Sequence, residues 1–481
     1  MRALIPALNP GVVHARLLEF VQSVLRPLGG AAPRGAASAK GSLQARLEAF
    51  IRAEQQRQGV VGLAVGVVHK GKVVLAKGYG SANLEHDVPV TADTLFQSGS
   101  LGKQFTAMAV MAQVEAGRLS LSDSITKFFP DAPASWAPIT VRHLLTHTSG
   151  IQDLEGKLDE RKDYTDEDFA RYIYALPLEF QPGARWGYSN SGYVLLGILV
   201  NRVAGKFYGE VLAEQVFRPA GMKTARGISE DDIVPHRSSG YRRVGEAVKH
   251  QTWVSPSLNT TADGSLYFSV KDMLAWDAAV ERRALLREES WREILSPAKL
   301  NSGSSQPYGF GWEVLERAGQ PLHKHSGAWQ GFRTAYARFI GERLSIVVLA
   351  NTAQSSPSRF VEGLAAIVNP ALAVPPLAAI PDTEPEVTAQ AAKLMEQVRD
   401  GTVDPARFAY VPEGLLSQRF PHYQALLRKL GAPGPLVLVK REVRGDDRLY
   451  QYQVRLGEGT WLLSMGLIPD GRVSFFDVRA P

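Results

Sequence analysis

Ser100 and Lys103, the ends of the run Ser-Leu-Gly-Lys, are residue types that can carry out acyl transfer. Apolar residues around them recur every three or four positions, at Leu101, Phe105, Met108 and Ala112. This spacing predicts a buried helix that ends at Gly117 and carries Ser100 in its first turn. Side chains three apart share a helix face, so we expect the Lys103 amine beside the Ser100 hydroxyl. A lysine whose pKa is lowered by burial can accept the serine proton, which makes the pair typical of an acylating serine.

The Ser-x-x-Lys pattern is not specific by itself, because it also occurs at Ser124–Lys127 and Ser296–Lys299. The first of these runs is followed by Phe-Phe-Pro, and the second contains Pro297, which is typical of a surface turn. We interpret both as structural. The assignment of Ser100 as a nucleophile therefore depends on further polar motifs.

Two further polar clusters lie far along the chain. Tyr188-Ser-Asn190 is the single Tyr-x-Asn of the sequence and lies on a predicted loop, and His325-Ser-Gly327 precedes a predicted strand. Each cluster also has a structural interpretation. Tyr188 can pack on the core as a loop aromatic, Asn190 can cap a helix that starts near Ser191, and His325 can be a hydrogen-bonded surface histidine.

Together the three motifs resemble those of the serine β-lactamase and penicillin-binding-protein superfamily, particularly its class C β-lactamase, D-aminopeptidase and esterase-like branch. The resemblance extends from Leu43 to Val368 and includes the order and spacing of all three motifs. It implies that Ser100 forms an acyl-enzyme and that Lys103 lies between Ser100 and Tyr188. A nearby cation lowers the pKa of a tyrosine, so Lys103 is expected to keep the Tyr188 phenolate accessible for proton exchange.

The resemblance also implies which groups meet the substrate: the side chain of Asn190, the strand residues His325, Ser326 and Gly327, and, as an oxyanion hole, the backbone N–H groups of Ser100 and Ala328. His325 stands where β-lactamases usually carry the lysine of Lys-Thr-Gly. A histidine with its ordinary pKa of about 6.5 is mostly neutral at pH 7. We therefore expect peptide or ester substrates without a required carboxylate.

Strands and helices must bring these distant motifs together. Apolar runs predict strands near residues 60–79 and 308–351, at both ends of the region, around a helical middle. The pattern favours an α+β fold in which one antiparallel sheet has flanking helices and an all-helical subdomain. The middle is expected to contain a helix over 139–150 capped by Thr140, a mainly helical stretch over 159–182 and an apolar helix over 194–204.

Composition along the chain predicts four segments. Residues 1–41 form a leader or a disordered segment, and residues 42–369 form the β-lactamase-like serine hydrolase domain. Residues 370–385 contain five prolines and are expected to form a semi-rigid linker. Residues 386–481 are expected to form a small C-terminal α+β domain with two helices and a four-strand meander.

Composition also excludes several classes of function. The net charge of +6 is small for 481 residues and no long basic run occurs, which argues against nucleic-acid binding. Without cysteine, the chain cannot use disulfides, thiolate metal sites or cysteine catalysis. No apolar run is long enough to predict a membrane-spanning helix. The basic, partly apolar start and Ala37-Ser-Ala39 favour a periplasmic or secreted location, with a cytoplasmic one as the alternative.

His143 and His147 are four residues apart, which is also a metal-ligand spacing on a helix. No His-Glu-x-x-His pattern accompanies them, so we favour hydrogen-bonded structural histidines over metal ligands. We expect no metal and no cofactor.

The motifs leave two functions open. The first is a serine hydrolase that cleaves an amide or ester of a small-molecule or peptide substrate, such as a D-amino-acid peptide, a small ester or a β-lactam, through an acyl-enzyme. The second is a catalytically slow, penicillin-binding-like scaffold protein that uses its C-terminal domain for contacts.

Overall fold

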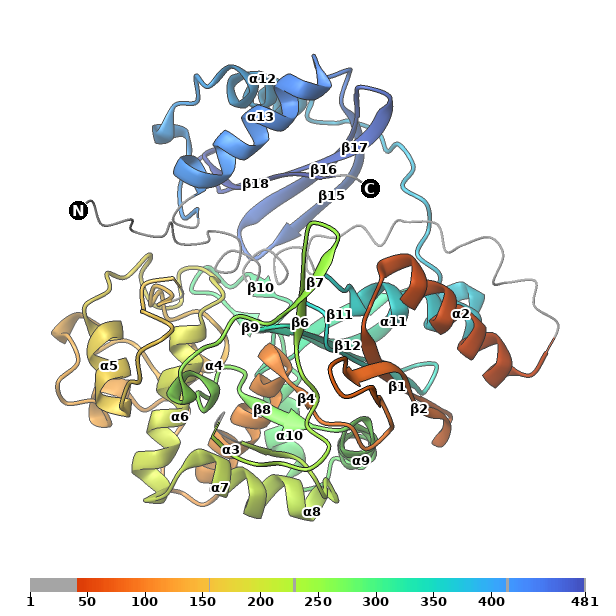
Figure 1. Ribbon diagram of the computed structural model, residues 1–481. Helices are drawn as coiled ribbons and strands as arrows, with labels where there is room; N and C mark the ends of the chain where they lie inside the picture. The colour runs from red at the N-terminus through yellow and green to blue at the C-terminus, as the bar shows by residue number, and fades with distance from the viewer. Residues whose placement is uncertain (1–40, 155, 228–230, 412–414, 480–481) are drawn as a thin grey trace, which may run out of the picture. The chain divides into compact units, whose positions relative to one another are not determined.

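The computed structural model of the chain describes residues 41–154, 156–227, 231–411 and 415–479 (Figure 1). The predicted leader covers residues 1–41, of which all but Gly41 lie outside the described residues. The described part forms two compact units, 41–298 with 307–373, and 299–306 with 374–479. Its mixture of helices and antiparallel sheets confirms the predicted α+β class. Among these residues, we find no helix with the length and apolar character that crossing a membrane requires.

A seven-stranded sheet, ordered β11-β12-β13-β14-β1-β2-β3, forms the frame of the first unit. The N-terminal strand β1 pairs antiparallel with the C-terminal strand β14, as the sequence predicted. Lys70 and Gly71 both have positive φ in the tight turn between β1 and β2. The strands are β1 (Gly62–His69), β2 (Lys72–Asn83), β3 (Val88–Pro89), β11 (Glu313–Arg317), β12 (Gln320–Trp329), β13 (Phe332–Phe339) and β14 (Leu344–Ala350).

Helices cover both faces of this sheet, which explains why all residues of β14 are buried. It also explains why this strand reads as a nearly continuous apolar run instead of alternating apolar and polar residues. Ile346 and Val348 pack in one apolar cluster with α2 (Leu43–Gln58) and α11 (Pro357–Val368). Val347 and Leu349 belong to the apolar cluster on the opposite face, which includes residues of α9 (Val270–Glu281). Successive strand residues point to opposite faces, so both sides need an apolar cover.

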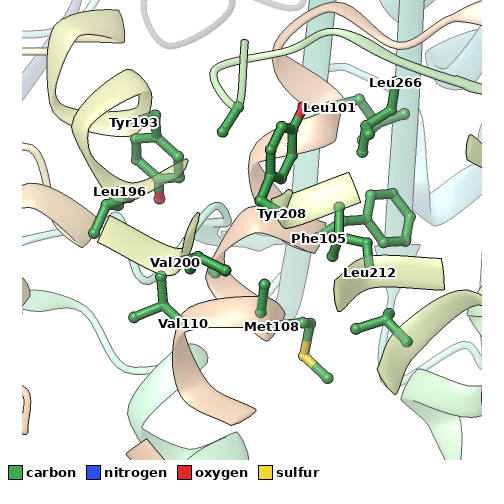
Figure 2. Packing of buried hydrophobic residues seen from close by; sticks show 14 of the residues in the cluster. Leu101, Phe105, Met108, Val110, Tyr193, Leu196, Val200, Tyr208, Leu212 and Leu266 are labelled. Atoms are coloured by element: carbon green, nitrogen blue, oxygen red, sulfur yellow. The ribbon is translucent and has the colours of Figure 1, made fainter. Parts of the chain in front are cut away.

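The helical subdomain packs around α3. Phe105 and Met108 of α3 lie among side chains of α6 and α7 in Figure 2, with Val200 and Leu212 nearby. These helices are α3 (Lys103–Glu115), α4 (Val141–Leu145), α5 (Asp166–Tyr174), α6 (Asn190–Ala204), α7 (Tyr208–Leu212), α8 (Arg218–Ala220) and α10 (Glu288–Ile294).

Three expectations for this subdomain were wrong in extent. Thr140 caps α4 as predicted, but the helix ends at Leu145, well before Gly150. Only α5 is helical between 159 and 182, because prolines at 177 and 182 break the pattern. The apolar helix α6 begins at Asn190, which is four residues earlier than expected.

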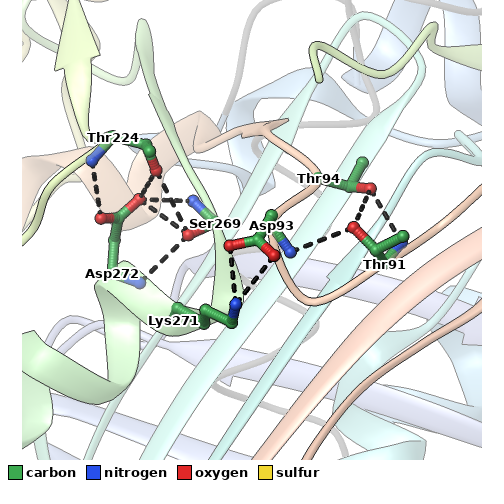
Figure 3. Close-up of polar contacts among 7 residues, drawn as sticks. All are labelled: Thr91, Asp93, Thr94, Thr224, Ser269, Lys271 and Asp272. Atoms are coloured by element: carbon green, nitrogen blue, oxygen red, sulfur yellow. Dashed lines mark hydrogen bonds and ion pairs between the residues drawn. The ribbon is translucent and has the colours of Figure 1, made fainter. Parts of the chain in front are cut away.

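A small second sheet leads directly into the Ser100 turn. Its strand order is β4 (Phe96–Gln97), β8 (Leu266–Phe268) and β5 (Arg226–Gly227). After β8, Ser269 and Asp272 form the capping box of α9, and Asp272 also accepts from Thr224 N at 3.0 Å (Figure 3). The cap therefore fixes the helix to the segment that precedes β5. A hairpin of β6 (Tyr241–Val244) and β7 (Ala247–His250) lies between β5 and β8 in the sequence.

The second unit is built on a four-stranded antiparallel sheet in the order β15-β16-β17-β18. Its elements confirm the predicted meander and two helices: α12 (Pro385–Asp400), α13 (Phe420–Leu430), β15 (Val437–Arg444), β16 (Asp447–Leu456), β17 (Gly459–Leu467) and β18 (Val473–Arg479). Residues 299–306, which run from the end of β9 (Ala298–Lys299) through β10 (Ser305–Gln306), also belong to this unit. In this segment Ser302 Oγ donates to Asp446 at 2.9 Å. Residues 374–384 contain no helix or strand.

Candidate active site

Ser100 lies in a 3₁₀ turn, η2 (Gly99–Gly102), and α3 begins after it at Lys103. The prediction that Ser100 occupies the first turn of the α-helix itself was therefore slightly wrong. Gly99 has φ of 52°, a left-handed conformation that suits glycine and allows the tight entry into the turn. Ser100 is partly exposed, whereas Lys103 is buried. The hydroxyl is thus accessible, and the amine lies behind it.

The Lys103 amine contacts three oxygens. Its Nζ lies 3.2 Å from Ser100 Oγ and 2.7 Å from Asn190 Oδ1, and it donates to the Asp263 carbonyl. The amide and carbonyl oxygens can only accept, so they hold two N–H groups of the amine. Ser100 is the partner that can either accept from an ammonium or donate to a neutral amine. The geometry thus suits proton exchange between Ser100 and Lys103.

Tyr188 lies beside the same amine, with its ring centroid 4.9 Å from Lys103 Nζ. Burial raises the pKa of Tyr188 well above its usual value, and a hydrogen bond with Ser100 acts in the opposite direction. Lys103 was expected to lower this pKa and so keep the phenolate accessible, but burial is the largest effect and the net shift is upward. In the resting protein Tyr188 is a phenol.

Asn190 is oriented by a residue that no sequence motif indicated. Asp153 Oδ2 accepts from Asn190 N and Asn190 Nδ2, both at 3.1 Å. The amide oxygen of Asn190 consequently faces Lys103. The predicted capping role of Asn190 was wrong, since Ser189 caps α6 by accepting from Gly192 N and Asn190 is the first helical residue.

The edge of β12 lies against the Ser100 turn. A Cβ added to Gly99 would lie 2.3 Å from Ala328 N, so only glycine allows this approach. A Cβ on Gly264 would likewise lie 2.9 Å from Ser100 N. Ser326 is partly exposed, whereas Gly327 and Ala328 are buried. The structure thus brings the two predicted oxyanion donors onto adjoining segments, and their role stays a prediction.

His325 is buried beneath this edge. Its Nε2 lies 3.0 Å from the Tyr308 hydroxyl and its Nδ1 lies 2.6 Å from the Ser326 carbonyl. Burial, and next the Lys103 charge, lower the pKa of His325 to about 3. His325 is therefore neutral at pH 7, and it is a buried rather than a surface histidine. Substrate contact by His325 stays a prediction, since both ring nitrogens already have protein partners.

The two histidines considered as metal ligands have separate structural roles. His143 Nδ1 accepts from Thr140 N at 3.2 Å within the capping box of α4. His147 lies beyond the end of that helix, with Nδ1 accepting from Ser189 N at 3.1 Å and Nε2 lying 3.2 Å from Tyr308 Oη. Across the described ranges, no group of three histidine or acidic side chains is arranged to hold a metal ion.

The sequence profile of the family described as Beta-lactamase matches residues 47–368. The chain belongs to the beta-lactamase family. This match confirms the predicted family and the predicted class of enzyme, a beta-lactamase-related hydrolase. It covers the sheet, the helical subdomain and the three motifs, and it ends before the second unit's C-terminal sheet.

Relatives of this beta-lactamase family member include penicillin-binding proteins and peptidases. Penicillin-binding protein 4* of Bacillus subtilis is 30% identical over 320 residues, which are 62% of this chain and 69% of that protein. A D-aminopeptidase of Gluconobacter oxydans is 29% identical over 353 residues, which are 69% of this chain. The chain spans 63% of the length of that D-aminopeptidase.

Solved structures share the fold. The octameric penicillin-binding protein homologue from Pyrococcus abyssi aligns with a TM-score of 0.60 at 24% identity, over 90% of this chain and 95% of that chain. The D-amino acid amidase of Ochrobactrum anthropi SV3, complexed with L-phenylalanine amide, aligns with a TM-score of 0.60 at 24% identity, over 69% of this chain and 99% of that chain.

Proposed function

We propose that this enzyme hydrolyses amides and small esters of D-amino acids, including peptides with an N-terminal D-residue, through an acyl-enzyme on Ser100. The observation that carries the proposal is the position of the buried Lys103 amine, which contacts Ser100 Oγ, Asn190 Oδ1 and the Asp263 carbonyl at once. A partly exposed hydroxyl with a buried amine behind it is the arrangement that nucleophilic catalysis by serine requires.

In the first half of the reaction, Ser100 Oγ attacks the carbonyl carbon while its proton passes to Lys103 in its neutral amine form. The resulting ammonium returns a proton to Tyr188 after Tyr188 has protonated the leaving group. The backbone N–H groups of Ser100 and Ala328 face the developing oxyanion. The leaving amine or alcohol takes a proton from Tyr188, whose raised pKa keeps its hydroxyl protonated until that step. A water molecule then attacks the ester of Ser100 with the same groups in the reverse order, releasing the acid and restoring the serine.

The neutral state of His325 supports acyl donors that lack a carboxylate. A carboxylate on the substrate would meet an imidazole with a pKa of about 3 where related enzymes supply an ammonium. The D-aminopeptidase relatives and the D-amino acid amidase fold neighbour favour D-amino acid derivatives among such donors.

The test compares hydrolysis of D-alanyl p-nitroanilide, L-alanyl p-nitroanilide, p-nitrophenyl butyrate and nitrocefin by the full chain. Ser100→Ala removes the proposed nucleophile, and Ser296→Ala is its matched control, since Ser296 lies in another Ser-x-x-Lys run, on the surface. We expect turnover of the D-anilide and the ester by the wild type and the control, and none by Ser100→Ala. Equal rates for wild type and Ser100→Ala on every substrate would disprove the proposal.

Intact-mass spectrometry after treatment with a fluorophosphonate separates this enzyme from a slow scaffold protein. The hydrolase is expected to form one adduct that Ser100→Ala abolishes, together with steady-state turnover. An adduct on Ser100 without turnover of any substrate would instead favour the scaffold function.

A further inference from the structure

Three buried side chains from three separate segments form one row of hydrogen bonds under the site. His147 follows α4, Tyr308 precedes β11, and His325 lies in β12, and each is 1% exposed. Tyr308 Oη lies 3.2 Å from His147 Nε2 and 3.0 Å from His325 Nε2. The mechanism above uses neither His147 nor Tyr308.

The backbone at the two ends of this row sets the direction of every bond in it. The Ser189 N–H can only donate, so His147 Nδ1 accepts it, and a neutral His147 must carry its proton on Nε2. At the other end the Ser326 carbonyl can only accept, so His325 carries its proton on Nδ1 and has an acceptor at Nε2. Within this row the Tyr308 hydroxyl therefore accepts from His147 and donates to His325, and the Tyr193 hydroxyl is a further hydrogen-bonding neighbour of Tyr308.

The hydrogen-bond directions in the row require His147, Tyr308 and His325 to be uncharged, and burial disfavours the charged form of each. Burial lowers the pKa of His147 well below its usual value, with the Lys103 charge acting in the same sense. Burial raises the pKa of Tyr308 well above its usual value. The row thus stays neutral while Lys103 and Ser100 exchange protons nearby.

His147 also carries an observed backbone strain. Its φ of 58° is uncommon for a residue with a side chain, and its carbonyl accepts from Gly187 N at 2.9 Å. The strained residue places the imidazole 4.3 Å from the Tyr188 ring and 4.9 Å from the Tyr308 ring, measured between centroids. His147 therefore contacts Tyr188, the proposed proton carrier, on one side and Tyr308 on the other.

We propose that His147 and Tyr308 are positioning residues of the reaction. Their row of hydrogen bonds, in which every donor and acceptor is fixed, connects the Tyr188 loop to β12 and stabilises the Nδ1–H tautomer of His325. This inference rests on the proposed function for its kinetic part only. The row connects the loop that carries Tyr188 and Ser189 to the Ser326–Ala328 edge of β12. Breaking it is expected to misplace Tyr188 and the oxyanion donors rather than to prevent substrate binding.

The tautomers can be measured without any turnover. In the full chain labelled with [¹⁵N]histidine, two-bond ¹H–¹⁵N spectra distinguish Nδ1–H from Nε2–H rings. His147→Asn and His325→Gln assign the two signal sets among the 10 histidines. We expect Nδ1–H for His325 and Nε2–H for His147, and we expect Tyr308→Phe to shift both sets. An Nε2–H ring at His325, or unchanged signals in Tyr308→Phe, would overturn the inference.

Tyr208→Phe is the matched control, because Tyr208 is equally buried and its hydroxyl donates to the Thr261 carbonyl outside the row. We expect it to leave both histidine signal sets in place. A general loss of packing would instead move the signals in both variants and would count against the inference. His147→Asn keeps an acceptor for the Ser189 N–H and tolerates positive φ, while it removes the bond to Tyr308 and the ring contact with Tyr188.

The kinetic readout separates positioning from binding. With p-nitrophenyl butyrate, Tyr308→Phe and His147→Asn are each expected to lower kcat about tenfold and to leave KM within about twofold. The rate of Ser100 labelling by fluorophosphonate should fall by a similar factor. Wild-type kcat and labelling rate in both variants would overturn the positioning role. If Ser100→Ala retained full activity, the proposed function would fail, while the tautomers would still be decided by the spectra.

Discussion

Replacement of Asp153 by alanine tests whether the orientation of Asn190 controls the reactivity of Ser100. Asp153 accepts from the backbone and the side-chain nitrogen of Asn190, both at 3.1 Å. Without these bonds the Asn190 amide is free to turn, and its nitrogen would then point at the Lys103 amine instead of its oxygen. Lys103 would lose an acceptor that now lies 2.7 Å away.

The size of the effect follows from the bond that is lost. A hydrogen bond to a charged group contributes about 1.5–3 kcal/mol, which corresponds to about 10- to 150-fold in rate if it is needed in the transition state. Asp153 is partly exposed, so water can replace some of its contacts and the lower part of this range is expected. The loss should appear in kcat with little change in KM, because Asp153 acts through Asn190 and Lys103.

Stopped-flow measurement of Ser100 acylation by a p-nitrophenyl ester gives the rate directly. Asp159→Ala is the control, since Asp159 is an aspartate of the same loop region that accepts from Arg161 N instead of Asn190. We expect the control to acylate at the wild-type rate. Acylation of Asp153→Ala within twofold of the wild type would refute the idea that Asp153 orients the amide.

Two other changes test the Ser100 turn and the carboxyl of Glu179, which is affected by the Asp153 charge. Gly99→Ala places a Cβ 2.3 Å from Ala328 N and is expected to lower the rate of fluorophosphonate labelling at least tenfold. Gly117→Ala is the control, since Gly117 has φ of 69° and open space around it. It should lower the free energy of urea unfolding by only about 1–2 kcal/mol and leave the labelling rate unchanged. Desolvation, and next the Asp153 charge, raise the pKa of Glu179 from 4.5 to about 7. The folded protein therefore binds the Glu179 proton more tightly than the unfolded chain does. Loss of that proton destabilises the fold as pH rises from about 4.5 through 7. Although desolvation of its carboxyl raises this pKa, the Glu179 residue as a whole is exposed, so Glu179→Gln should raise the melting temperature only slightly at pH 8 and leave it unchanged at pH 4 in scanning calorimetry.

Local periodicity explains what could be predicted from the sequence. The spacing of Leu101, Phe105 and Met108 indicated the buried helix α3, and the three-residue spacing placed Lys103 next to Ser100. The four-strand meander of the C-terminal sheet was predicted, since its strands alternate or are bounded by turns. Such patterns report on neighbours along the chain, and they were reliable for that reason.

The parts of the site that were missed depend on contacts between distant segments. Asp153 lies 37 residues before Asn190 in a loop without periodicity. The Asp263 carbonyl is a backbone group, so no residue type signals its contact with Lys103. Tyr308 was expected in a strand because its surroundings are apolar, but β11 begins only at Glu313. Tertiary packing, not local preference, decides each of these positions.

Burial also explains why the electrostatic prediction for Tyr188 failed. The sequence placed a cation beside the phenol and so predicted a lower pKa, which is correct for the nearby charge alone. The structure adds a desolvation penalty that acts on the phenolate and is larger. Only the fold determines how much water reaches the hydroxyl, so the sign of the net shift could not be read from residue types.

The distribution of burial across the site favours a catalytic rather than a stabilising purpose for Lys103. Its side chain is 0% exposed, and the oxygens that it contacts at Ser100, Asn190 and Asp263 are all uncharged. Moving an ammonium out of water is costly, and neutral acceptors offset only part of that cost. An apolar side chain of similar volume would fill the same space at lower free energy. We therefore propose that the amine is present for its effect on the Ser100 hydroxyl, which is partly exposed.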